Sequence, residues 1–225
     1  MINIKLWGSF KIKKIILVIL IIMAVGIISY NGFINKQNKK SESNISNIEE
    51  ESIIKPTEES RYNDEEKQIY DEVYNLFFSK KYDEAISKAD VLLKYYPDSY
   101  MGYNIRGIAK AYNGNFDEGM KDIDESLKIN SEYGYARFNK ALTYELYGDM
   151  DKAMEWYIKA LEIEDYVWSY YGIASIYARK GNVEETMKYL NKAIELDSNV
   201  KEVAKDEEDF NAVKNSEEFK KSVYN

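Results

Sequence analysis

The sequence predicts an all-α fold, a solenoid in which four helical hairpins follow one another along the chain. A short pattern recurs four times between Tyr82 and Asp197, at spacings of 34, 34 and 33 residues, with small residues at fixed places in the copies. Such a period is typical of stacked helical hairpins rather than of one globular core. The copies are Tyr82-Asp83-Glu84-Ala85-Ile86, Phe116-Asp117-Glu118-Gly119-Met120, Met150-Asp151-Lys152-Ala153-Met154 and Val183-Glu184-Glu185-Thr186-Met187, followed by the aliphatic residues Leu93, Leu127, Leu161 and Ile194.

Each copy contains the residues that two closely packed helices need. In the third copy, Ala141 and Tyr144 share one face of a first helix, Gly148 supplies the turn, and Ala153 and Tyr157 share the facing side of a second helix. Small residues let the helices approach, and the aromatic rings fill the space beside them. The corresponding small positions are Val73, Gly107, Ala141 and Ala174 in the first helices and Ala85, Gly119, Ala153 and Thr186 in the second helices, with turn glycines Gly114, Gly148 and Gly181.

These positions resemble the tetratricopeptide repeat family, whose unit of 34 residues has small residues and a turn glycine at the same intervals. The resemblance implies a right-handed superhelical solenoid with units at about 66–99, 100–133, 134–166 and 167–200. Several residues depart from the family pattern. Lys80 stands where the first unit should have its turn glycine, and Val73 and Thr186 are bulkier than usual. Only Pro97 keeps the family's closing proline; the other units have Ser131, Asp165 and Ser198 there. The two outer units are therefore the least regular, as expected for ends that face solvent.

The N-terminal part of the chain predicts a membrane anchor. Residues 1–14 contain four lysines and no acidic residue, and residues 15–34 are almost wholly apolar. About 20 apolar residues in a helix are long enough to cross a bilayer. We therefore expect a single-pass protein of the cell membrane, with a short cytoplasmic N-terminal tail and extracytoplasmic repeats, since the lysines precede the span. A secretory signal cleaved near Ala24-Val25-Gly26 is the alternative.

Residues 35–64 are expected to be a flexible linker, because they are rich in Asn, Ser, Lys and Glu and contain few apolar residues. Asn63 and Glu66 match a capping box that would open the first helix of the repeats. At the other end, residues 201–225 break the period and predict two short capping helices that begin near Asp206 and Ser216. We expect these helices to bury Phe210, Val213 and Phe219 against the last repeat.

Composition argues against nucleic acid as a partner and against catalysis. Beyond residue 35 the chain has 27 basic and 39 acidic residues, and phosphate binding depends on clustered Lys and Arg. The chain contains no His and no Cys, which removes the commonest general base and the usual zinc and nucleophilic thiol chemistry. Two carboxylate pairs, Asp122 with Asp124 and Glu184 with Glu185, are expected on solvated helix faces where their members point apart. No catalytic residue, metal or cofactor is therefore predicted.

The resemblance implies a groove, lined by first-helix residues, that takes an extended or helical peptide. Aromatic rings dominate the positions that project there, and Tyr and Trp give large contact areas at low entropy cost. We expect the ligand to be a peptide or protein, from another membrane or envelope protein; a cell-wall glycan binder and a homo-oligomerising structural protein are the alternatives. Some of these rings are also expected to pack between hairpins. The positions are Tyr70, Tyr74, Phe77, Phe78, Met101, Asn104, Ile108, Tyr112, Tyr135, Phe138, Leu142, Leu146, Trp168, Tyr171 and Arg179.

Overall fold

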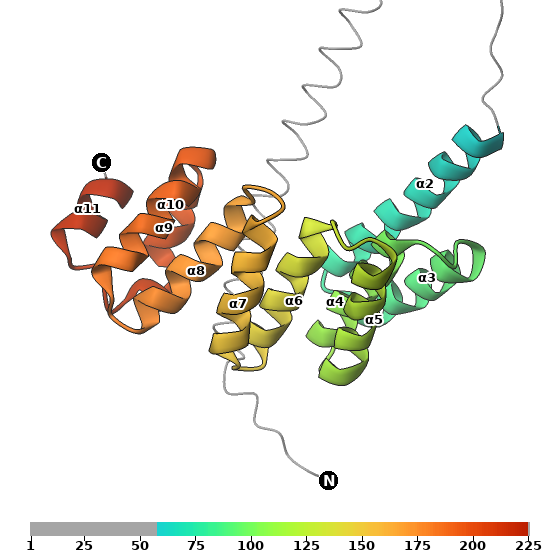
Figure 1. Cartoon of the computed structure of the whole chain (residues 1–225), viewed down its shortest axis with the longest axis horizontal. Helices are drawn as coiled ribbons and strands as arrows, with labels where there is room; N and C mark the ends of the chain where they lie inside the picture. Colours follow the sequence, from blue (N-terminus) through green and yellow to red (C-terminus); the bar gives the residue numbers. More distant parts are fainter. Residues whose placement is uncertain (1–57, 225) are drawn as a thin grey trace, which may run out of the picture. The chain divides into compact units, whose positions relative to one another are not determined.

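The computed structural model describes residues 58–224, with side chains from Asp64 onward, and every regular element in this range is helical (Figure 1). The prediction of an all-α fold is confirmed for this part of the chain. Four hairpins are followed by short C-terminal helices. The elements are α2 (Glu58–Phe78), α3 (Tyr82–Tyr95), α4 (Tyr100–Tyr112), α5 (Phe116–Ile129), α6 (Gly134–Leu146), α7 (Met150–Leu161), α8 (Val167–Arg179), α9 (Val183–Leu196), α10 (Val200–Asp206), the 3₁₀ helix η1 (Glu208–Phe210) and α11 (Glu217–Val223).

The predicted basic tail, membrane span and most of the predicted linker lie outside the described residues. Among the helices that the structure describes, none combines the length and apolar character needed to cross a membrane. Helix α2 begins at Glu58, so the expectation that this helix opens at Asn63 is wrong. Residues 58–64, which were assigned to the linker, are therefore helical and form the first turns of α2.

Helix ends follow the local sequence. The side chains of Ser99, Asn115, Asp149 and Asn182 each accept a hydrogen bond from the backbone N–H three residues later, which satisfies an otherwise free donor. The three turn glycines, Gly114, Gly148 and Gly181, have φ angles of 94°, 90° and 71°. Lys80 occupies the equivalent turn of the first hairpin with φ 62°, a left-handed conformation that favours glycine.

The small residues set how closely the helices pack, as expected from the sequence. A Cβ atom on Gly107 of α4 would lie 2.7 Å from the carbonyl oxygen of Gly119 in α5, and the reverse distance is the same. A side chain at either position would push the two backbones apart. Gly172 permits equally close packing between hairpins, because a Cβ atom added there would lie 2.5 Å from the ring of Tyr157.

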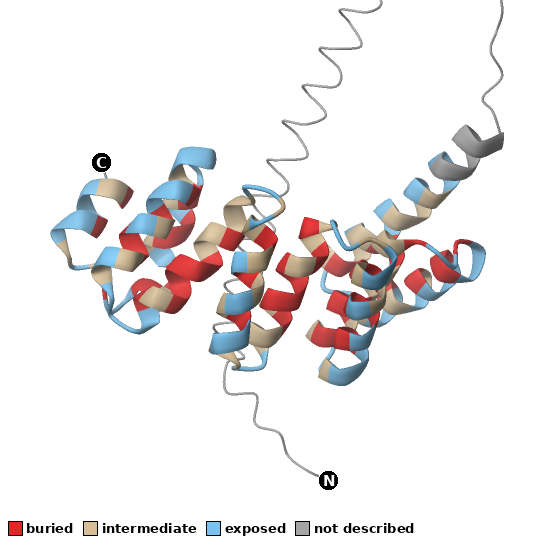
Figure 2. Ribbon diagram, in the orientation of Figure 1, coloured by how far each residue is buried: buried red, intermediate tan, exposed pale blue. Residues whose placement is uncertain are grey.

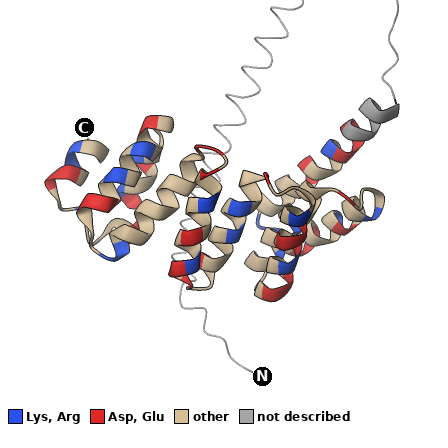
Figure 3. Ribbon diagram, in the orientation of Figure 1, with Lys and Arg blue, Asp and Glu red and all other residues tan. Residues whose placement is uncertain are grey.

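The first helices of successive hairpins form one continuous layer. Contacts join α2 to α4, α4 to α6 and α6 to α8, while each second helix packs on its own first helix and on the next one (Figure 1). Buried residues lie on the helix sides that face one another, and exposed residues lie on the outer sides of α3, α5, α7 and α9 (Figure 2). Acidic and basic residues are interspersed along the same helices (Figure 3). We call the side of α2, α4, α6 and α8 that carries the predicted groove positions the inner face.

The C-terminal segment covers the last hairpin. Phe210, Val213, Phe219 and Val223 are fully buried and pack with Leu190 and other residues of α8 and α9 in one core cluster. The predicted burial of Phe210, Val213 and Phe219 is thus confirmed, and Ser216 caps α11 through Phe219 N–H as expected. The first short helix, expected to begin near Asp206, is η1; Glu207 caps it, and Asp206 is the last residue of α10. We call residues 207–224 the cap.

Candidate partner-binding face

The structure places the predicted groove residues in two groups. Four are buried, and of these Phe77, Ile108 and Phe138 belong to the hydrophobic core clusters, while Asn104 is fully buried between α4 and α6. These four side chains contribute to packing between hairpins. The remaining residues keep part of their surface accessible: Tyr70, Tyr74, Phe78, Met101, Tyr112, Tyr135, Leu142, Leu146, Trp168, Tyr171 and Arg179.

The aromatic rings of the first two hairpins form a packed group. The ring of Phe77 lies 4.9 Å from that of Phe78, 5.4 Å from Tyr112 and 5.7 Å from Tyr82. Burial raises the pKa of Tyr82 to about 12 and that of Tyr112 further, so both phenols stay neutral at physiological pH. These contacts link α2 and α3 to α4. As expected for some of the rings, they pack between hairpins here.

The third hairpin repeats this arrangement with different residues. Tyr135 stacks on Phe138 at 5.9 Å, and Tyr166, from the turn before α8, meets Phe138 edge to face at 4.9 Å. Asn139 donates a hydrogen bond to the Asn104 side chain (Nδ2 to Oδ1, 3.1 Å), which joins α6 to α4 inside the molecule. The sequence prediction of inner-face positions did not include Asn139, because its buried polar contact arises only when α4 packs on α6.

The fourth hairpin carries two further partly accessible groove rings, Trp168 and Tyr171. Trp168 meets Tyr171 edge to face at 5.5 Å, and Tyr171 meets Phe210 of η1 at 5.4 Å. The Tyr171 hydroxyl oxygen is buried and has no hydrogen-bond partner among the described residues. Burial, together with the nearby carboxylates of Glu207 and Asp209, raises its pKa. Tyr171 thus connects the accessible ring of Trp168 to the cap.

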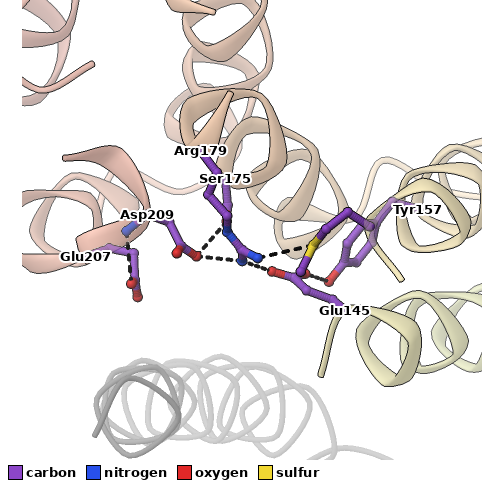
Figure 4. Close-up of polar contacts among 7 residues, drawn as sticks. Glu145, Tyr157, Ser175, Arg179, Glu207 and Asp209 are labelled. Atoms are coloured by element: carbon purple, nitrogen blue, oxygen red, sulfur yellow. Dashed lines mark hydrogen bonds and ion pairs between the residues drawn. The ribbon is translucent and has the colours of Figure 1, made fainter. Parts of the chain in front are cut away.

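A polar cluster lies beside these rings, where α6, α8 and η1 meet (Figure 4). The Arg179 guanidinium donates hydrogen bonds to Glu145 and to Asp209, the latter with Nη2 2.6 Å from Oδ2. Glu145 also accepts a hydrogen bond of 2.7 Å from the Tyr157 hydroxyl, and Asp209 accepts one of 2.8 Å from Ser175 Oγ. We call Glu145, Arg179, Glu207 and Asp209 the Arg179 cluster.

The carboxylates of this cluster are held in a poorly solvated place. Side-chain exposure is 13% for Glu145 and 11% for Asp209, and Glu207 is 9% exposed as a residue. Burial raises the pKa of Glu145, an effect that Arg179 and Tyr157 oppose. Burial, followed by the negative charge of Asp209, raises the pKa of Glu207 to about 7.

Of this cluster, the sequence identified only Arg179 as an inner-face residue. Glu145 lies three residues after the predicted position Leu142, and Ser175 lies four residues before Arg179, so the helical period contained a signal for both. Glu207 and Asp209 carried no such signal, because the cap lies outside the repeats. Their position follows from the docking of Phe210 against α8 and α9.

The two carboxylate pairs do not form a catalytic dyad in the structure. The expectation that Asp122 lies on a solvated face is wrong: it is buried, with Arg106 and Lys110 each 2.7 Å from its carboxylate oxygens. Asp124 instead pairs with Lys140, and Glu185 pairs with Lys188. In the described part of the chain, no group of His, Cys, Asp and Glu residues is suited to hold a metal ion.

Comparison with known sequences and structures agrees with this architecture. Residues 135–165 and 169–200 match the sequence profile described as tetratricopeptide repeat. The structure also aligns with a thermophilic tetratricopeptide repeat protein of Thermus thermophilus, with a TM-score of 0.56 and 19% identity over 61% of this chain and 77% of that one. The solenoid has the tetratricopeptide repeat fold. A second structure with this likeness, MamA, gives a TM-score of 0.50 and 23% identity over 59% of this chain and 78% of its own.

Curated relatives cover less of the chain. Photosystem I assembly protein Ycf3 from two strains of Prochlorococcus marinus is 36% and 38% identical over 63 residues. That alignment spans 27% of this chain and 36% of each relative. This chain therefore matches only about a third of the length of these relatives.

Proposed function

We propose that this chain is a non-enzymatic tetratricopeptide repeat scaffold that binds a peptide segment of a partner protein along its inner face. The supporting observation is that apolar and aromatic side chains remain partly accessible on three adjoining first helices. These are Met101 on α4, Leu142 and Leu146 on α6, and Trp168 and Tyr171 on α8. Partly accessible rings next to apolar side chains provide contact area without requiring the core to open.

We further propose that the bound partner is a membrane or envelope protein and that binding assists its assembly. The name of the Ycf3 relatives describes an assembly protein, and they are 36% and 38% identical to this chain over 63 residues. The apolar segment at residues 15–34 would hold the repeats at the membrane where such a partner resides. The inner face would then act as a transient holder for a partner segment.

Binding is tested by selecting peptides from a random display library on the immobilised protein. Trp168→Ala removes an accessible ring of the inner face, and we expect it to weaken binding of selected peptides by about tenfold or more. Ile158→Ala is the matched control, because Ile158 is an exposed apolar residue on α7 and lies outside the predicted groove. Equal affinity of both variants, or binding of cell-wall fragments without any selected peptide, would contradict the proposal.

The membrane placement is tested by labelling single cysteines, since the natural chain has none. Ser87→Cys puts a thiol at an exposed position of α3, and Ser9→Cys puts one in the basic tail. We propose that the N-terminus is cytoplasmic and the repeats are extracytoplasmic. A membrane-impermeant maleimide should therefore label only the thiol at residue 87 in intact cells, and the opposite pattern would show that the orientation is reversed.

A further inference from the structure

One guanidinium connects three elements of the fold. Arg179, the last residue of α8, contacts Glu145 of α6 and Asp209 of η1, and Ser175 of α8 donates a second hydrogen bond to Asp209 (Figure 4). These are charge-assisted contacts in a poorly solvated place, which are stronger than neutral hydrogen bonds. The cap is therefore fastened to the hairpins by polar contacts as well as by the apolar side chain of Phe210.

The charges in this cluster do not balance. Glu145, Glu207 and Asp209 supply three carboxylates, and Arg179 contacts two of them, Glu145 and Asp209. Among the described residues, the hydroxyls that adjoin these carboxylates are neutral: Tyr157 on α7, and Tyr171 and Ser175 on α8. Glu207 accepts hydrogen bonds from the backbone N–H groups of Asp209, at 3.4 Å, and of Glu208. Three poorly solvated carboxylates beside one cation are unfavourable unless one of them takes up a proton.

We propose that the Arg179 cluster is a proton-controlled latch, which holds the cap against the last hairpin when one carboxyl group is protonated and weakens when all three are ionised. In the docked state Glu207 is 9% exposed, whereas release of η1 returns its carboxylate to solvent. The docked state therefore binds the proton more tightly than the released state, and proton binding and docking are linked.

The pKa values give the direction and the pH range. The docked pKa of Glu207, about 7, lies above the ordinary value of 4.5. Between these two values the docked state binds more protons, so docking becomes less favourable as pH rises. Above pH 7 both states are ionised and the effect levels off. Between pH 6 and pH 8 this linkage weakens docking by about tenfold.

Release of the cap would uncover the apolar end of the solenoid. Phe210 and Phe219 cover Ala178, Met187 and Leu190, which belong to the same buried cluster. In a tetratricopeptide repeat solenoid, the next hairpin would stack at this end. The latch would therefore make a stacking surface accessible at alkaline pH and cover it at acidic pH.

Hydrogen exchange on the full chain in mild detergent tests the latch. Protection factors, corrected for the intrinsic pH dependence of exchange, are compared for residues 207–224 and for α4 to α7. We expect protection of residues 207–224 to fall about tenfold between pH 6 and pH 8 in the natural protein. Glu207→Gln removes the charge without changing the volume, so its protection should stay high and constant across this range.

Two further variants sharpen the result. Glu202→Gln on α10 removes an exposed carboxylate that pairs with Lys205, and it should keep the natural pH profile. Arg179→Met should lower protection of residues 207–224 at both pH values, because Glu145 and Asp209 then lose their shared cation. The proposal is overturned if protection of residues 207–224 in the natural protein does not change with pH, or if the Glu207→Gln variant keeps that change. The Glu207→Gln comparison decides the question even if Arg179→Met unfolds the chain.

Discussion

At the scale of single residues, turn conformation and side-chain size control the hairpins. Gly114, Gly148 and Gly181 adopt positive φ at three turns, and Lys80 adopts it at the fourth. A left-handed conformation is costly for a residue with a Cβ atom, because that atom approaches the following carbonyl oxygen. The first turn therefore carries backbone strain that the other three turns avoid.

Lys80→Gly should relieve this strain. We expect the free energy of unfolding to rise by about 1 kcal/mol, because the native φ of 62° becomes unstrained, less the entropy that glycine adds to the unfolded chain. Urea denaturation followed by circular dichroism measures the change. Gly114→Ala is the control with the opposite expected sign, a loss of stability. Nothing lies within 4 Å of the added Cβ, so any loss comes from backbone strain at φ 94°. A Lys80→Gly variant less stable than the natural protein would argue against this account.

At the scale of helices, buried ion pairs fix how first and second helices meet. Arg106 of α4 makes two hydrogen bonds of 2.7 Å to Asp122 of α5, and Lys110 of α4 lies 2.7 Å from the same carboxylate. Asp122 has 7% of its side-chain surface exposed, against 16% for Arg106 and 17% for Lys110. The pair of glycines at Gly107 and Gly119 brings the helices close enough for these contacts.

Asp122→Ala should destabilise the protein strongly, because it leaves two poorly solvated cations without their shared carboxylate. We expect a loss of about 2–3 kcal/mol, since Arg106 keeps its contact with Asp90 and both cations retain some solvent. Glu125→Ala on the same helix is the control, because its partner Lys128 is exposed and such surface pairs contribute little. Equal unfolding free energies for the two variants would show that the Asp122 contacts are energetically unimportant.

At the scale of the whole molecule, residues 57–225 form one compact unit whose C-terminal end is closed by the cap. Residues 1–56 lie outside the described part of the chain. Repeat folds are stabilised by contacts between neighbours, so an uncovered terminal hairpin loses one of its two packed sides. Stability should therefore depend on the cap much more than on residues 1–56.

Ending the chain at Asn199 tests this dependence. The truncated protein loses the buried residues Val200, Phe210, Phe219 and Val223, and we expect its Tm to fall by about 10 °C or more. Its exposed apolar end should also promote self-association, seen by analytical ultracentrifugation. Deleting residues 1–56 is the control and should leave the helical melt nearly unchanged. The dependence on the cap would be refuted if the Asn199 truncation melted like the natural chain and stayed monomeric.

Much of the fold could be predicted because its causes are local. Helix positions follow from the period, hairpin turns from glycines, and close approach from small residues, all of which occupy fixed places in a repeated unit. Helices α4, α6 and α8 begin at Tyr100, Gly134 and Val167, where the second, third and fourth units were expected to begin. The start of α2 could not be predicted from Asn63, because a capping motif competes with a helix that can extend further upstream.

The candidate binding site was less predictable, because accessibility depends on neighbours that are distant in sequence. Helical periodicity placed both Phe138 and Trp168 on the inner face. In the structure, Tyr135 and Tyr166 pack on Phe138, which is buried, whereas Trp168 stays partly accessible. Asp122 was expected in solvent from its charged surroundings. Its burial results from Arg106 and Lys110, which lie on the facing helix.

The sequence by itself determined that this protein is a helical solenoid with four hairpins and an apolar closure after the last one, because spacing and residue size act within each unit. Only the tertiary structure decided which inner-face side chains are accessible and how the cap is fastened. The Arg179 cluster joins residues from α6, α8 and the start of the cap, and burial at that junction shields its carboxylates from water. Burial is a property of the assembled helices, so no local pattern in the sequence could specify it.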